Sequence, residues 1–147
     1  MLEACDKIRQ EWFEDAHIIK NVFQKLIEQN IKIFNIQSDI SDFRGISKKK
    51  HYFIFVNTKN VNIEGQRFTI LHELGHLLLN FDKSLSIDEE EILCNTFSSN
   101  ILYSEKNLKK DNEIVPENRY QIMLKNAKNI LEEKKLERYN INYFANI

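Results

Sequence analysis

Residues that interrupt regular backbone structure are scarce in this chain. Its 147 residues include one proline and three glycines. Because glycine and proline build most tight turns and end most helices, their scarcity favours helices joined by short connections over a sandwich of many strands. One of the glycines, Gly75, nevertheless lies inside the most apolar helix-like stretch, RFTILHELGHLLLN at residues 67–80. A glycine there costs about 1 kcal/mol of helix stability relative to alanine, so we expect another backbone, a strand edge, to approach the helix at that turn.

Length and composition indicate one folded unit. A chain of this size with 42% hydrophobic residues can bury a core without disulfides or a structural metal. We expect a single domain over residues 1–147, with its core at about 31–104 and a helical C-terminal extension at about 105–147. The formal net charge of -1 provides no global basic field, so neither nucleic acid nor a membrane is expected as a direct partner.

The N-terminus and the cysteines favour a cytoplasmic protein. The first twenty residues place charges every few positions among apolar residues, unlike a signal peptide or a membrane span. Cys5 and Cys94 lie far apart and match no paired metal or redox spacing, which is typical of free thiols in a reducing compartment. Cys94 lies in an apolar segment and is most simply a small buried side chain.

Periodicity divides the chain into helices around a small sheet. Helical spacing over about residues 6–29 predicts one long helix or two short ones, and the segments IKIFNI (31–36) and HYFIFVN (51–57) are typical of strands. Because the segment between them is turn-rich, we expect the two strands to form a small sheet with a third segment nearby. Further helices are predicted at about 64–79, 87–102 and 116–138, and the apolar tail NINYFANI is expected to pack or to be partly strand-like. The predicted class is α+β with a small, mostly antiparallel sheet.

The segment LHELGHLLL carries the residues best suited to chemistry. His72 and His76 are four residues apart, which on a helix places both imidazoles on one face, one turn apart, where they can reach one metal ion. Glu73 projects beside that position, where its carboxylate can accept a proton from an attacking water. The alternative is that both histidines are satisfied core residues without a metal.

A catalytic zinc normally takes three protein ligands, so a third is needed. Glu91 and Asn95 share one face of the next predicted helix, and Glu91 is the expected ligand, while Asn95 can hydrogen-bond a ligand histidine and fix its tautomer. Glu89 and Glu90 compete for that role but fit better as acids near the helix start. A Cys94 thiolate would suit a closed structural site instead of an open one.

These motifs resemble the ImmA/IrrE family of zinc-dependent metallopeptidases, found in bacteria and on their mobile elements. The resemblance rests on RFTILHELGHLLL, on the pattern E-x-x-C-N-x-F that begins at Glu91, and on the strand HYFIFVN with Gly45 before it, and it covers about residues 43–102. The family usually ends the second motif with L-M-P, whereas here Leu102 is followed by Tyr103 and Ser104.

The resemblance implies a compact zincin-like fold with N-terminal helices, a small sheet and two metal-bearing helices. It implies one zinc bound by His72, His76 and Glu91, with Glu73 as the catalytic base. It also implies a protein substrate, a helix-turn-helix DNA-binding repressor of a mobile element or a stress response. One alternative is a non-catalytic or metal-binding regulatory protein that inactivates a repressor by binding; another is a zinc hydrolase acting on a cell-wall peptide.

The group that stabilises the oxyanion besides zinc stays open at this stage. His51, Arg67 and Tyr103 are suitable residue types. Sequence spacing does not choose among them, and each also has a plain structural role available at a strand start, a helix start or the edge of the core.

Overall fold

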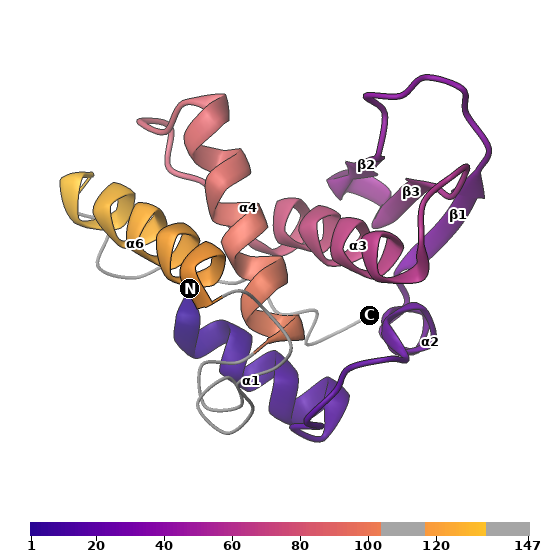
Figure 1. Ribbon diagram of the computed structural model, residues 1–147, viewed down its shortest axis with the longest axis horizontal. Coiled ribbons are helices and arrows are strands. Elements are labelled where there is room, and N and C mark those ends of the chain that lie inside the picture. The colour runs from indigo at the N-terminus through magenta and orange to yellow at the C-terminus, as the bar shows by residue number, and fades with distance from the viewer. Residues whose placement is uncertain (104–116, 135–147) are drawn as a thin grey trace.

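The computed structural model describes residues 1–103 and 117–134. Helix α3 lies at the centre of the arrangement, with the sheet on one side and helix α4 on the other (Figure 1). Helices α1 and α6 pack against α4, and α2 packs against α3. The architecture is therefore α+β, as the sequence predicts.

Two short helices form the N-terminal part. Helix α1 spans Leu2–Phe13 and helix α2 spans Val22–Glu28. The break follows α1, where Glu14 and Asp15 adopt left-handed backbone angles with φ of 54° and 49° that end a right-handed helix. The fully buried Arg9 side chain ties this turn to the rest of the fold, since its guanidinium donates to the carbonyl oxygens of Ala16 and Ile101. Of the two expectations for this region, the pair of short helices is the one observed.

A three-stranded sheet follows, with the order β1-β3-β2. Strand β1 spans Lys32–Ile36, β2 spans Gly45–Lys48 and β3 spans Phe53–Asn57, with a single 3-10 turn, η1, at Lys49–His51. The third strand of the sheet is β2, which lies between the two predicted strands in the chain, a position that was not predicted. In β3, Ile54 and Val56 are buried while Phe53 and Phe55 are partly exposed, so β3 has one face on the core.

The sheet is mixed, which corrects the expectation of a mostly antiparallel one. Strand β2 pairs with β3 antiparallel, but β1 pairs with β3 parallel, with Phe34 opposite Phe55. Successive strands do alternate in direction along the chain. However, β3 inserts between β1 and β2, so the first and third strands, which run the same way, become neighbours. Period-two patterning identifies strands but carries no information about which strands are adjacent.

The remaining helices carry most of the core. Helix α3 spans Ile63–Leu78, α4 spans Ile87–Leu102 and α6 spans Glu117–Glu133. The bounds of α3 and α4 agree with the predicted helices, and α6 lies within the predicted 116–138 segment. The expected behaviour of the tail NINYFANI lies outside the described residues. Within the described ranges, no helix combines the length and the apolar character needed to cross a membrane.

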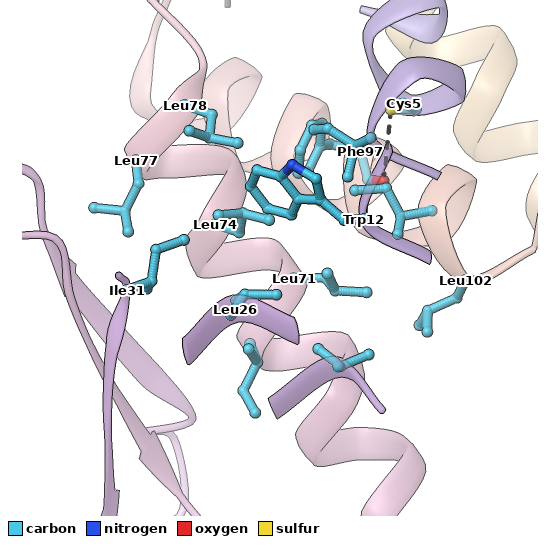
Figure 2. Close-up of a cluster of buried hydrophobic side chains, with 14 of the residues drawn as sticks. Cys5, Trp12, Leu26, Ile31, Leu71, Leu74, Leu77, Leu78, Phe97 and Leu102 are labelled. Atoms are coloured by element: carbon cyan, nitrogen blue, oxygen red, sulfur yellow. Dashed lines mark hydrogen bonds between the residues drawn. The ribbon is translucent and has the colours of Figure 1, made fainter. Parts of the chain in front are cut away.

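The core forms where α3 meets α4 and the N-terminal helices (Figure 2). Four leucines of α3 are each at most 1% exposed: Leu71, Leu74, Leu77 and Leu78. Phe97 of α4 and Trp12 of α1 pack into the same cluster, and the Cys5 thiol donates to the Phe97 carbonyl oxygen at 3.8 Å. This packing fixes α3 and α4 rigidly relative to one another.

Candidate metal centre

The two histidines of HELGH lie on one face of α3. Their ring centroids are 4.9 Å apart and their Nε2 atoms 3.2 Å apart. Both side chains are mostly buried, with 13% and 23% of the His72 and His76 side-chain surface exposed. The four-residue spacing thus places both imidazoles one turn apart, as helical geometry requires.

Helix α4 places Glu91 opposite the histidines. The helix begins with a capping box, in which the Ser86 hydroxyl accepts from the Glu89 amide at 3.2 Å and the Glu89 carboxylate accepts from the Ser86 amide at 2.7 Å. The hydrogen bond from the Ser86 amide to the carboxylate is the main cause that lowers the pKa of Glu89. Glu89 is therefore occupied at the helix start, which agrees with the sequence-based choice of Glu91 over it.

Three groups that can bind a metal converge at this point. The Glu91 carboxylate oxygens lie 3.1 Å from His72 Nε2 and 3.0 Å from His76 Nε2. His72, His76 and Glu91 each offer one ligand atom, and these atoms all lie within 4.8 Å of one another. The structure therefore brings together the three residues that the sequence proposes as ligands, from two helices; their role as ligands stays a prediction.

The donor set fits a zinc ion. Zinc binds imidazole nitrogen and carboxylate oxygen at about 2.0–2.1 Å in a tetrahedron, so ligand atoms around it lie roughly 3.3 Å apart. The separations of 3.0, 3.1 and 3.2 Å are close to that spacing. Neutral imidazole nitrogens and a carboxylate facing one another at these distances repel unless a cation or protons lie between them. Three protein ligands leave one coordination position open, which is the pattern of catalytic and not of structural zinc sites.

Asn95 orients the first histidine. It lies one turn after Glu91 on α4, and its Oδ1 is 2.8 Å from His72 Nδ1. In this geometry Nδ1–H donates to the amide oxygen, so the lone pair of Nε2 is directed at the proposed metal position. This contact is the one expected from the sequence.

Glu73 lies beside the cluster, beneath strand β2. The residue is 7% exposed and lines a pocket of about 670 Å³ together with His72, Glu91 and Asn95. A pocket of that volume is typical of ligand sites. The other lining residues come from the segment before β2 and its first residue, from the loop between β3 and α3, and from the first half of α3: Asp42, Arg44, Gly45, Asn60, Val61, Asn62, Gly65, Phe68 and Thr69. Glu73 can therefore reach a group bound in the pocket without belonging to the cluster of three.

A buried asparagine holds the wall of the pocket in place. The Asn57 side chain, at the end of β3, donates to the carbonyl oxygens of Ser38 and Phe43 at 3.1 and 2.9 Å, and accepts from the amides of Ser38 and Lys59 at 3.1 and 3.2 Å. All four hydrogen-bonding positions of the amide are thus used. Sequence reasoning missed this residue, although a polar residue ending a buried strand is a usable signal.

The neighbour of Gly75 differs from the expectation. A Cβ at this position would lie 3.1 Å from Cys94 Sγ, 3.3 Å from Phe97 Cδ1 and 3.4 Å from the Cys94 Cα. The close backbone is therefore α4, and not a strand edge. The strand that does approach α3 carries its own glycine, Gly45, and meets the helix at Thr69 and Glu73. The expectation failed because helical phase places Gly75 on a face but does not say which element covers that face.

The cysteines and the remaining polar candidates lie elsewhere. Cys94 is fully buried against Gly75, and burial raises the pKa of its thiol, so it remains protonated. His51 stacks on Phe53, Arg67 lies 4.0 Å from Glu64, and Tyr103 packs against the core. None of these three oxyanion candidates is among the described residues that line the pocket.

Comparison with protein families identifies the chain. Residues 27–120 match the Peptidase_M78 family, described as the IrrE N-terminal-like domain. The comparison with curated proteins gave no match, and neither did the comparison with solved structures. The matched segment covers well over half of the chain and includes the sheet, α3, α4 and every residue of the candidate centre. The chain therefore belongs to the ImmA/IrrE family, a membership that supports a metallopeptidase-type function.

Proposed function

We propose that the chain is a zinc-dependent endopeptidase that cleaves a protein, a helix-turn-helix transcriptional repressor of a mobile element or a stress response. The observation that carries the hydrolytic part is the convergence of His72, His76 and Glu91 beside the pocket-lining carboxylate of Glu73. Family membership supports the peptidase class. The repressor as substrate rests on the resemblance of the two motifs to those of family members that act on such proteins.

Each residue has a defined task in this proposal. His72, His76 and Glu91 would hold the zinc, and Asn95 would keep the His72 ring in the orientation that its hydrogen bond fixes. A bound zinc would supply Lewis acidity, which polarises the scissile carbonyl and acidifies water. Glu73 would accept the proton of the attacking water and donate it to the leaving amine. The pocket beside Glu73 would hold the peptide, with the wall before β2 facing the substrate.

The presence of Glu73 favours hydrolysis of the repressor over inactivation of the repressor by binding alone. A protein that only holds a repressor needs no carboxylate in the pocket beside the cluster, and burying one costs free energy. The Glu73 residue is nevertheless only 7% exposed and lies directly against β2. A proton-transfer role explains why a carboxylate is kept there.

Incubation of the purified, zinc-loaded chain with purified helix-turn-helix repressors from the same genome tests the proposal. Mass spectrometry of the products should reveal a single cut by the wild-type chain. The Glu73→Gln variant should keep its zinc and lose cleavage by at least about 10²- to 10⁴-fold, the usual contribution of a general base. Glu64→Gln, on the same helix but with its side chain 64% exposed and paired with Arg67, should cleave normally. Tight binding of the repressor without any cut would instead favour the non-catalytic alternative.

A further inference from the structure

Strand β2 crosses over Glu73 at the one position of that strand that has no side chain. An ideal Cβ on Gly45 would lie 3.1 Å from Glu73 Cγ and 3.2 Å from Glu73 Oε1. It would also lie 2.7 Å from the Cγ2 methyl of Thr69, which precedes Glu73 by one helical turn. Carbon atoms in contact normally lie about 3.5–4.0 Å apart, so alanine does not fit here without displacement.

Backbone conformation does not explain this glycine. No glycine of the chain has a positive φ, and Gly45 pairs with Val56 in the regular antiparallel ladder. Any residue could adopt that backbone, and glycine weakens a strand because it has no side chain to pack and loses more entropy on folding. The requirement at this position is therefore space above Thr69 and Glu73.

The Glu73 carboxylate depends on packing for its orientation. Within residues 1–103 and 117–134, no donor forms a hydrogen bond to it. Its neighbours on the two sides are Thr69 on its own helix and Gly45 on β2, both of which line the pocket with it. A small movement of β2 against α3 would therefore be transmitted directly to this carboxylate.

We propose that Gly45 is a positioning residue, whose missing side chain leaves the space in which β2 holds the Glu73 carboxylate facing the pocket. This inference rests on the function proposed above, since it concerns the orientation of the proposed base. It assigns a task to the strand that runs along the pocket, beyond pairing with β3. It also predicts that substitution slows the chemical step while zinc binding is kept, because Gly45 is on a different element from His72, His76 and Glu91.

Gly45→Ala tests this assignment. The added methyl should displace the Glu73 carboxylate by several tenths of an ångström or more, and misplacement of a reacting group by about 1 Å costs on the order of 10²-fold in rate. We expect kcat on the cleaved repressor to fall by up to about 100-fold, a larger change than in KM, with the zinc content per chain unchanged. A crystal structure of the variant should contain the carboxylate in its displaced position.

Two further variants test whether Gly45 positions the Glu73 carboxylate or only keeps β2 at its distance from α3. Thr69→Ala removes the methyl that the new Cβ would meet at 2.7 Å but leaves both contacts with Glu73. The double variant Gly45→Ala/Thr69→Ala should therefore stay as slow as Gly45→Ala, and it carries the test if the single variant fails to fold. Ser47→Ala, two residues along on the same face of β2, introduces an alanine away from Glu73 and should match the wild type.

The outcomes are distinct. Full activity of Gly45→Ala with the carboxylate in place would refute the assignment, as would recovery of kcat in the double variant to the level of Thr69→Ala, since Gly45 would then only space β2 from α3. If the wild-type chain cleaves nothing, the proposed function fails. The crystal structure of Gly45→Ala would still decide the positioning claim, because a displaced carboxylate supports it and an undisturbed one overturns it.

Discussion

At the scale of single residues, the site depends on contacts that helical phase makes predictable. His72 and His76 share a face of α3 because they are four residues apart, and the same spacing places Asn95 one turn after Glu91 on α4. The sequence therefore predicts which side chains can act together within each helix. It does not predict Gly45, because the contact between a strand glycine and Glu73 joins residues that only the folded chain brings together.

Asn95 should matter through its hydrogen bond to His72 Nδ1. Asn95→Ala should lower zinc affinity by about 10- to 100-fold, the usual effect of removing a group that orients a metal ligand. Competition with a zinc-chelating indicator dye measures this affinity. Asn95→Asp retains an oxygen acceptor, so its loss of zinc affinity should be much smaller. Equal affinities for wild type and Asn95→Ala would remove the orienting role.

Gly75 should resist substitution because α4 packs closely against it. Gly75→Ala gains up to about 1 kcal/mol of helix propensity, but the new methyl meets Cys94 and Phe97, which are both 0% exposed and are surrounded by the packed core. Overpacking of a filled core typically costs about 1–3 kcal/mol, so chemical denaturation should give a net loss of stability of roughly 1 kcal/mol.

A double-mutant cycle checks the cause of that loss. Cys94→Ala removes the Sγ atom that lies closest to the new methyl. The pair Gly75→Ala/Cys94→Ala should therefore be more stable than the sum of the two single effects. Simple additivity would contradict close packing as the reason for the glycine.

At the scale of elements, the sequence predicts the type and length of each helix and strand better than it predicts which of them lie side by side. Helices α3 and α4 are recognisable from the helical spacing of their apolar residues, and α4 also from the acidic residues at its start. Strand β1 is recognisable from its alternation, and β3 from its run of aromatic and β-branched residues. The parallel pairing of β1 with β3 and the contact of Gly75 with α4 were not predictable. Both features depend on which elements pack against each other, and the local pattern of apolar residues does not indicate this.

Asn57 links the end of β3 to the wall of the pocket, and its substitution should change both the stability of the chain and its KM. Asn57→Ala leaves the backbone groups of Ser38, Phe43 and Lys59 without the hydrogen bonds that they now have. Urea denaturation should show a loss on the order of 2–3 kcal/mol. Zinc content should stay the same while KM for the substrate rises, because the wall and not the metal centre is loosened. Asn35→Ala, exposed on β1, is the matched control and should be neutral; an equally neutral Asn57→Ala would contradict the linking role.

At the scale of the whole molecule, the candidate metal centre depends on helix α3. One of its sides packs on α4, another faces β2 and β3, and the histidines lie where α4 brings Glu91 across. The metal centre is therefore a product of helix packing, and residues far from it, such as Arg9, contribute by fixing the end of α4. The prediction that residues 1–147 form one domain with a core at about 31–104 stays a prediction.

The zinc content of the purified chain tests the central claim most directly. Elemental analysis should give close to one zinc per wild-type chain, held by the three converging side chains. Glu91→Ala should lower that occupancy sharply, because two ligands remain of three. The neighbouring substitution Glu90→Ala, outside the cluster of three, should leave it unchanged. Full zinc occupancy in Glu91→Ala, or a wild-type chain that binds no zinc, would contradict the assignment of this centre.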